Sequence, residues 1–341
     1  MSKAYLFDDN GHSAHKSAYF DDHDEIQTLK VPTQASSGDN PMTDLNGVPV
    51  DTYRVSGQMI CCSKERASNL DTRTANYQLS PINKALVAHV VTKAGLQGRA
   101  ITLGVTVPWG EAFMHGAGNK NTRHLQAVAN HYKNGELINL SNNEGFNFES
   151  VEAYPEGLSA FFDFMIDHKG NPTPLSLATQ GPVGIIDIGG STTDVVTIIK
   201  GSSITIDHGR SGTNNVGVLD AKKTLGKAIS DGTGGGYSVA GGATSSRVVD
   251  AVFDTGFLRS GLEETNFTKA LASAKQSVSS QIINYIDATI GSVLDYETLL
   301  IVGGGAIVFK NELSAKYPTA HFSDEYANAR GGLKYMRRFS G

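Results

Sequence analysis

The segment from Val183 to Asp194 constrains the fold of this chain more than any other part of the sequence. Runs of β-branched residues bounded by glycines predict strands, so we expect a buried strand over 183–188 and a returning strand over 194–199. The tight turn between them contains Gly189, Gly190 and Ser191. This hairpin therefore delivers the carboxylate of Asp187 into a turn of glycines and hydroxyl groups.

That combination of residues is typical of polyphosphate binding. Gly189 and Gly190 let backbone N–H groups approach phosphate oxygens closely, and the hydroxyls of Ser191 and Thr192 can donate further hydrogen bonds. A carboxylate at the end of the strand, Asp187, can order the water shell of Mg²⁺. The alternative is an ordinary hairpin in which Asp187 only caps the turn.

A second hairpin with an acidic, glycine-containing turn is predicted at the N-terminus. We expect strands over 4–8 and 15–20, joined by a turn that begins at Asp9, Asn10 and Gly11. Lys16 follows Asp9 by seven residues, and its point charge suits a terminal phosphate. Taken alone, this segment favours an ordinary solvated hairpin.

The two acidic hairpins divide the sequence into two similar parts. Asp9 and Asp187 are 178 residues apart, close to half of the 341-residue chain, which favours two related lobes. A chain of this length also exceeds the roughly 250–300 residues that one hydrophobic core supports. We therefore predict one domain over 1–170, to which a helix over 325–341 returns, and a second domain over 171–324.

A third glycine-rich segment follows an apolar strand predicted over 298–302. Its residues are Gly303, Gly304, Gly305 and Ala306, whose small size would let a flat base and a ribose lie close to the backbone. A plain turn from strand to helix is the alternative. The sequence contains neither G-x-x-x-x-G-K-[ST] nor G-x-G-x-x-G, which argues against a P-loop and against a dinucleotide-binding Rossmann site.

The remaining segments alternate between strands and helices, as in an α/β protein. We predict a helix after Ser80 that ends before Gly95, a strand over 100–107, an amphipathic helix over 156–166 and a long helix over 267–290. The glycine-rich run over 232–242 is predicted to be a mobile surface loop.

Composition excludes several classes of protein. A net charge of −5 gives no overall attraction to nucleic acid or to anionic membranes. No apolar run approaches the roughly 20 residues of a membrane span, and the acidic N-terminus does not resemble a signal peptide, so a cytoplasmic location is expected. Adjacent Cys61 and Cys62 indicate reduced structural thiols.

In this order, the three glycine-rich segments resemble the phosphate-one, phosphate-two and adenosine motifs of the superfamily of actin, heat-shock chaperones and sugar kinases. Within it, the spacing of Asp9, Gly11 and Lys16 and the mid-chain segment 187–194 are most similar to the bacterial plasmid-segregation actins ParM and StbA. Segments 104–108, 151–160 and 329–335 also resemble parts of that family.

The resemblance implies an actin-like fold of two ribonuclease H-like domains, each with a mixed five-stranded sheet flanked by helices and with a nucleotide in the cleft between them. It implies ATP or GTP with Mg²⁺ as ligands. Glu156 would orient the attacking water, and Asp187 and Asp9 would support Mg²⁺ through its waters. The nucleotide-binding residues carried over by position are Asp9, Gly11, Ser13, Lys16, Gly189, Gly190, Ser191, Thr192, Gly217, Lys275, Gly303, Gly304, Gly305 and Ala306.

Several of these positions have a structural alternative. If Glu156 begins a helix, its carboxylate would complement the helix dipole without any catalytic role. Lys275 could lie on the solvated face of the long helix. Ser13, His12 and His15 depart from the family's phosphate-one loop, and we expect both histidines to be structural.

The resemblance further implies an ATPase that polymerises into dynamic filaments and segregates plasmid DNA. Its partners would be other copies of the chain and a small DNA-binding adaptor on a centromere-like site, with no direct contact to nucleic acid or membrane. A sugar or acyl kinase of the same superfamily is the alternative, although no carboxylate lies in a sugar-kinase-like motif. A chaperone-like nucleotide switch is disfavoured because no peptide-binding domain is evident.

Overall fold

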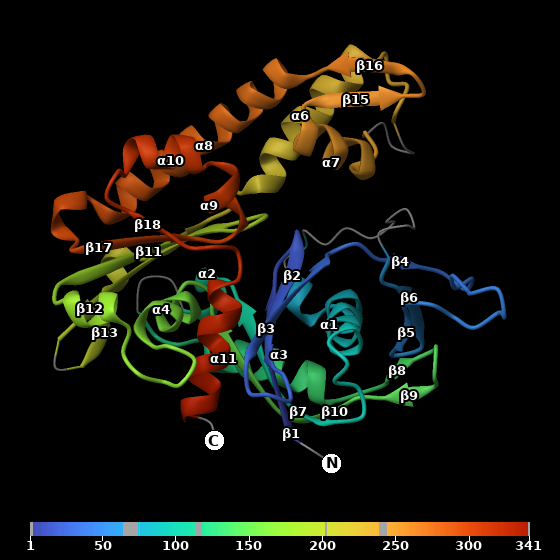
Figure 1. Ribbon diagram of the computed structural model, residues 1–341, viewed down its shortest axis with the longest axis horizontal. Helices are drawn as coiled ribbons and strands as arrows, with labels where there is room; N and C mark the ends of the chain where they lie inside the picture. Colours follow the sequence, from blue (N-terminus) through green and yellow to red (C-terminus); the bar gives the residue numbers. More distant parts are fainter. Residues whose placement is uncertain are drawn as a thin grey trace.

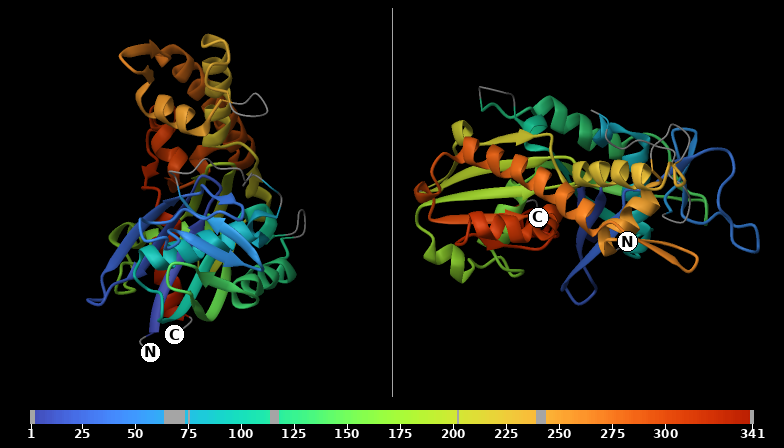
Figure 2. Two further views of the ribbon diagram at one scale, coloured as in Figure 1. Left: turned by 90° about the vertical axis from the view of Figure 1, so that its right-hand side faces the viewer. Right: turned by 90° about the horizontal axis from the view of Figure 1, so that it is seen from above.

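The computed structural model describes residues 3–63, 74, 76–113, 118–201, 203–238 and 244–339. It contains two large mixed sheets, each with helices on its faces; one sheet lies at the left of Figure 1 and the other near its centre. Turning the molecule shows that the upper part is narrower and sits on a broader lower part (Figure 2).

The first large sheet has the strand order β10-β7-β1-β2-β3. Its strands are β1 (Lys3–Asn10), β2 (Ala14–Phe20), β3 (Ile26–Pro32), β7 (Ala100–Val107) and β10 (Asn147–Pro155). β1, β2 and β3 form an antiparallel meander, whereas β7 and β10 run parallel to β1. The predicted strand over 100–107 is confirmed without a shift.

The second large sheet repeats this arrangement. Its order is β13-β12-β11-β17-β18, and a sixth strand, β14, also pairs with β12. β11 and β12 form the antiparallel hairpin, and β17 and β18 run parallel to β11. The strands are β11 (Pro182–Ile188), β12 (Thr193–Lys200), β13 (Ile204–Ile206), β14 (Gly212–Asn214), β17 (Thr298–Val302) and β18 (His321–Phe322). The two-lobed repeat expected from the spacing of the acidic hairpins is therefore present in the topology, with a sixth strand in the second sheet.

Two helices cover one face of the first sheet. α1 (Pro81–Lys93) is capped by the Ser80 side chain, which accepts a hydrogen bond from Asn83 N, as the sequence predicts. It packs into one apolar core with α3 (Thr122–Lys133). A small antiparallel sheet extends this lobe and consists of β4 (Ser36–Ser37), β5 (Thr52–Val55), β6 (Gln58–Cys61), β8 (Leu137–Asn139) and β9 (Glu144–Gly145).

The outer face of the second sheet is covered by a separate apolar core. Its helices are α6 (Val218–Gly232), α7 (Ser246–Thr255), α8 (Thr268–Ile290), α9 (Gly304–Val308) and α10 (Lys310–Lys316). A hairpin of β15 (Phe257–Ser260) and β16 (Glu263–Asn266) extends beyond α7 at the upper right of Figure 1. Of the glycine-rich run over 232–242, the end of α6 and the turn up to Ser238 are described, and residues 239–242 lie outside the described part.

Two further helices lie between the large sheets. α4 (Leu158–Met165) buries Phe161 against β11, β12 and β17 of the second sheet. α11 (Ala327–Phe339) packs Leu333 and Met336 against Phe7 of β1. The two helices touch closely, because a Cβ on Gly331 would lie 2.0 Å from the Ser159 carbonyl oxygen. The last helix thus packs on the first sheet.

The other short elements connect these layers. They are α2 (Trp109–Ala112), α5 (Pro174–Ala178) and the 3-10 turns at Tyr77–Leu79, His208–Arg210 and Val293–Asp295. Cys61 and Cys62 are buried and free, as the sequence indicates. Within the described ranges, no helix combines the length and the apolar character needed to cross a membrane.

Candidate active site

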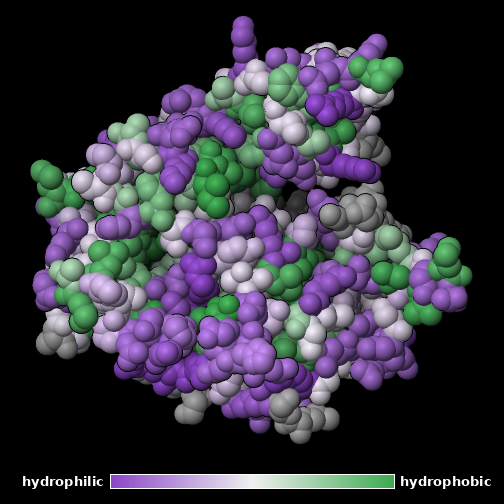
Figure 3. Space-filling model, viewed as in Figure 1, coloured by the Kyte–Doolittle hydropathy of each residue, from purple (hydrophilic) through white to green (hydrophobic). Residues whose placement is uncertain are grey.

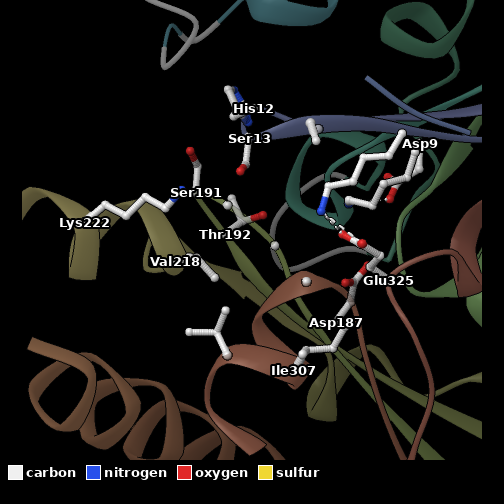
Figure 4. Close-up of a pocket in the computed structure, with 18 of the residues that line it drawn as sticks. Asp9, His12, Ser13, Asp187, Ser191, Thr192, Val218, Lys222, Ile307 and Glu325 are labelled. Atoms are coloured by element: carbon white, nitrogen blue, oxygen red, sulfur yellow. Dashed lines mark hydrogen bonds and ion pairs between the residues drawn. The ribbon is translucent and has the colours of Figure 1, made fainter. Parts of the chain in front are cut away.

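A cavity of about 270 Å³ lies where the two acidic hairpins meet. Figure 3 shows the molecule hollowed between its upper and lower parts on the right, and Figure 4 shows side chains from both parts around this space. The cavity is lined by Asp9, Gly11, His12, Ser13, Ala14, Lys16, Lys30, Glu156, Asp187, Gly189, Gly190, Ser191, Thr192, Val218, Lys222, Phe253, Asp254, Gly304, Ile307, Val308 and Glu325. Eleven of the predicted site residues are in this set.

The first hairpin contributes an ion pair. Asp9 and Lys16 lie directly opposite each other on β1 and β2, and Lys16 Nζ is 3.0 Å from Asp9 Oδ2. Thr106 of β7 donates its hydroxyl to Asp9 Oδ1 at 3.0 Å. Burial opposes the charge on Lys16, but the carboxylates of Asp9, Asp187 and Glu156 together raise its pKa, so the lysine remains cationic.

The predicted turn of this hairpin is displaced along the chain. Asp9 and Asn10 belong to β1, and the turn is formed by the following residues, starting at Gly11. The prediction of a turn at Asp9 was wrong because cross-strand partners for these polar residues are not visible in the sequence: Lys16 pairs with Asp9, and the Asn10 amide donates to Asn83 and Tyr132.

Asp187 occupies the corresponding position in the second hairpin. It is 4% exposed and lies opposite Asp194 in the ladder between β11 and β12. Burial, followed by the nearby Asp9 carboxylate, raises the pKa of Asp187 to about 6, although Asn328 donates a hydrogen bond to it. In Figure 4 Asp9 and Asp187 approach the same side of the cavity.

The glycine turn of the second hairpin packs against the turn of the first hairpin. A Cβ on Gly190 would lie 2.7 Å from Ser13 Cβ, so glycine allows the two turns to approach each other. Among the described residues, Ser191 Oγ is buried and has no hydrogen-bond partner. A buried hydroxyl without a partner beside a cavity fits a ligand that supplies an acceptor.

Gly217 supports the same turn from behind instead of lining the cavity. It caps α6, where the Asp220 carboxylate accepts its N–H, and an added Cβ would lie 2.5 Å from the Gly190 carbonyl oxygen. The structure therefore places this predicted binding residue beneath the turn.

Because Gly217 packs against backbone, a methyl group there cannot be accommodated by a side-chain rotation. We expect Gly217→Ala to lower the free energy of unfolding by about 1–3 kcal/mol. Thermal unfolding measures this loss. Gly145→Ala is the matched control, since the nearest atom to an added Cβ is 3.7 Å away, and equal melting temperatures for the two variants would contradict the packing role.

Glu156 lies in the turn that joins β10 to α4, and it is not part of the helix. The helix begins at Leu158, and its first turn contains no acidic residue. The prediction that a helix starts at Glu156 was wrong because Gly157, at a φ of 74°, breaks the chain direction before the helix. Burial and then the carboxylates of Asp194, Asp9 and Asp187 raise the pKa of Glu156 well above its usual value.

Asp194 is an additional buried acid that sequence reasoning did not select. Its Oδ1 accepts hydrogen bonds from Trp109 N at 3.2 Å and from the Thr213 hydroxyl at 2.5 Å. Burial outweighs these hydrogen bonds and raises the pKa of Asp194 to about 7. Its position at the end of the motif over 187–194 was the available signal.

The opposite end of the cavity is mainly apolar. Val218, Phe253, Ile307 and Val308 line it, and Figure 4 shows Val218 and Ile307 away from Asp9. The Phe253 ring lies 5.2 Å from Lys222 Nζ and 5.1 Å from Lys275 Nζ. An aromatic ring flanked by cations at an apolar surface suits a flat heteroaromatic group.

Four predicted binding residues other than Gly217 do not line the cavity. Lys275 contacts Phe253 from behind. Gly303 leaves room for Asp187, since a Cβ added at Gly303 would lie 2.4 Å from Asp187 Oδ1. Gly305 leaves room for the Ile188 side chain in the same way. Ala306 is buried in the core, so only Gly304 of this segment reaches the cavity.

Lys30 and Glu325 were missed because they are 295 residues apart and belong to no motif. Their side chains form an ion pair at 2.7 Å beside the cavity, between β3 and the segment before α11. His12 and His15 were predicted to be structural. His15 is fully buried between Asp8 and Tyr77, whereas the His12 ring packs against the Tyr77 ring at a tilt of 33° and also lines the cavity.

The charges of the cavity fit a polyphosphate only together with a divalent cation. Five carboxylates line it (Asp9, Glu156, Asp187, Asp254 and Glu325) against three lysines (Lys16, Lys30 and Lys222). In the described ranges, no three His, Cys, Asp or Glu side chains are grouped to hold a metal directly. Mg²⁺ usually retains several waters and binds through one or two carboxylates plus phosphates, which fits Asp9 and Asp187.

Comparison with known families gives matches to both parts of the chain. The model for the N-terminal part of the plasmid segregation protein ParM matches residues 5–167. The model for the C-terminal part of the archaeal MreB-like actin homologue matches residues 185–315. The chain is a ParM-type actin-like protein. No curated protein sequence matches it.

Solved structures share the fold of this ParM-type protein over its whole length. A ParM subunit from a 15-stranded filament of Clostridium botulinum is 20% identical with a TM-score of 0.75, and 99% of this chain and 100% of that chain are covered. An archaeal actin homologue in complex with ADP is 18% identical with a TM-score of 0.71, covering 98% and 99%. ParM from Bacillus thuringiensis with AMPPNP is 13% identical with a TM-score of 0.62, covering 99% and 100%.

Proposed function

We propose that this ParM-type protein binds a nucleoside triphosphate with Mg²⁺ in the cavity between its two sheets and hydrolyses it. The observation that carries the proposal is the meeting of Asp9 and Asp187, from topologically equivalent hairpins, beside Lys16 and the Gly189–Gly190 turn. Relatives described as complexes with ADP and with AMPPNP support this choice of ligand. ATP is the expected nucleotide, with GTP as the alternative base.

Each group has a distinct task in this proposal. Lys16 neutralises phosphate charge, and the amides and hydroxyls of residues 189–192 donate to phosphate oxygens. Glu156 orients the attacking water and accepts its proton, for which a raised pKa makes it a stronger base. When bound, Mg²⁺ would neutralise charge that develops on the phosphates. The apolar end with Val218 and Phe253 would take the base.

We further propose that nucleotide-bound subunits assemble head to tail into filaments that segregate plasmid DNA. A filament described for a relative supports assembly, and the match to a plasmid segregation protein supports the role. A small DNA-binding adaptor on a centromere-like site would attach the filament, in the cytoplasm. Residues 1–170 with the last helix, and residues 171–324, would be the two domains that close on the nucleotide.

The assembly prediction follows from this proposal. With a non-hydrolysable ATP analogue, the protein should sediment as filaments above a critical concentration, because a head-to-tail contact does not close. With ADP it should remain in the supernatant. Sedimentation with electron microscopy of the pellet measures this, and closed oligomers or monomers with every nucleotide, GTP analogues included, would contradict it.

A further inference from the structure

The second residue of α11, Asn328, contacts both halves of the proposed site. It is 3% exposed, and its Nδ2 donates to Asp187 Oδ2 at 2.5 Å. Its Oδ1 accepts from Gly157 N and from Ala160 N, each at 3.1 Å. One amide group therefore connects the end of β11 to the turn that carries Glu156.

The orientation of this amide is fixed by its surroundings. Two N–H groups face Oδ1 and a carboxylate faces Nδ2, so the flipped amide would place donors against donors and an oxygen against an oxygen. Asparagine is one of the few side chains that can donate to a carboxylate and accept from amides at the same time. The contact thus depends on this residue type.

The N-terminus of α4 has no side chain of its own that can cap it. Its N-cap residue, Gly157, has a φ of 74° and no side chain, and an added Cβ would lie 2.9 Å from Val196 Cγ2. The free amides at the start of the helix must therefore be satisfied from another element. Asn328 does so from α11, and at the same time holds Gly157 next to Glu156.

Further contacts hold α11 against α4. Arg330 and Lys334 both bind the Asp163 carboxylate of α4, at 2.8 and 2.7 Å. The close approach of Gly331 to Ser159 adds a backbone contact between the same helices. Small movements of α11 relative to β11 would consequently be transmitted to Asp187 and to the Glu156 turn together.

We propose that Asn328 is a positioning residue that fixes the distance between Asp187 and Glu156 and so sets the rate of hydrolysis. This inference rests on the proposed function, because it assigns roles to those two carboxylates. Asn328 does not line the cavity, so it acts on the reaction through the residues that it holds. Nucleotide affinity should depend on it far less than turnover does.

Asn328→Ala should lower kcat at least about 10-fold, since small displacements of catalytic groups are costly, while nucleotide affinity stays within about threefold. Affinity can be followed by the fluorescence of Trp109, the only tryptophan. Lys334→Ala is the matched control: Arg330 still binds Asp163 and Asn328 keeps its contacts with Asp187, Gly157 and Ala160, so this variant should keep its kcat. Asn328→Ser replaces the alanine variant if the latter does not fold.

A reciprocal exchange tests the contact without activity. Asn328→Asp should lower the melting temperature by placing two carboxylates together, and adding Asp187→Asn should restore it, because the amide can then donate in the opposite direction. Wild-type kcat in Asn328→Ala, equal loss of kcat in Lys334→Ala, or absence of thermal rescue would each overturn the inference. A parent protein that does not hydrolyse nucleotide would overturn the proposed function itself, and that failure appears before any substitution is made.

Discussion

Glu156→Gln should reduce nucleotide hydrolysis by roughly 10²–10⁴-fold, the usual contribution of a positioned acid–base group. Glutamine keeps the size of the side chain but cannot accept a proton from water. Nucleotide affinity should change little, and filaments formed with ATP should persist because the step that weakens them is removed. Phosphate release and sedimentation measured on the same samples check both results.

The fold should tolerate this substitution well. The folded pKa of Glu156 lies above its unfolded value, so the ionised carboxylate reduces stability as pH rises through that interval. At neutral pH the glutamine variant should therefore melt at or above the wild-type temperature. Glu152→Gln, at an exposed position on β10, the strand that precedes Glu156, is the control for both measurements.

The pH dependence gives a separate check on the role of Glu156. If the carboxylate accepts a proton from water, wild-type turnover should rise with pH through the raised pKa of this residue and then level off. The glutamine variant should lack that rise. Normal phosphate release in a folded Glu156→Gln protein, or an unchanged pH profile, would contradict the catalytic role.

Asp187→Asn should lower hydrolysis by at least roughly 10²–10³-fold, comparable to the loss of a main electrostatic stabiliser of a transition state. Asparagine retains an acceptor for Asn328 but removes the negative charge beside Asp9. Burial and Asp9 raise the pKa of Asp187 to about 6, so removal of the charge should not destabilise the fold at pH 7.

The decisive measurement is the effect of Mg²⁺ on nucleotide affinity. In the wild type, Mg²⁺ should strengthen nucleotide binding relative to a chelator, and in Asp187→Asn this increment should be largely lost. Asp9→Asn should behave alike, and the double variant should lose little more, because both carboxylates order one water shell. A variant that retains both turnover and the Mg²⁺ effect would refute the assignment.

Most of the strands and the glycine turn of the second hairpin could be predicted from the sequence because their signals are local, whereas the turn of the first hairpin begins at Gly11 and not at Asp9. The strand over 100–107 and the cap at Ser80 each depend on residues that are close together in the sequence, and the structure confirms both. Periodicity in the long helix was also sufficient, as α8 begins at Thr268. The repeat of two hairpins was visible because strand, acid and glycines recur in the same order.

The composition of the site depended on tertiary structure. Local sequence could not indicate that Gly303 and Gly305 make room for Asp187 and Ile188 instead of meeting a ligand, because both neighbours belong to another strand. It could not place Glu156 outside the helix either, since the positive φ of Gly157 is stabilised by a side chain from α11. The family resemblance supplied Glu156 as a candidate, and the three-dimensional structure decided its environment.

What the sequence determined by itself is the alternation of buried strands and amphipathic helices, and the two carboxylates near the ends of equivalent strands, because periodicity and turn chemistry act over a few residues. Only the tertiary structure decided which groups surround those carboxylates. Lys30 meets Glu325 and Asn328 meets Asp187 across 295 and 141 residues, and contacts at such separations are fixed by the packing of whole sheets and helices, which no local pattern encodes.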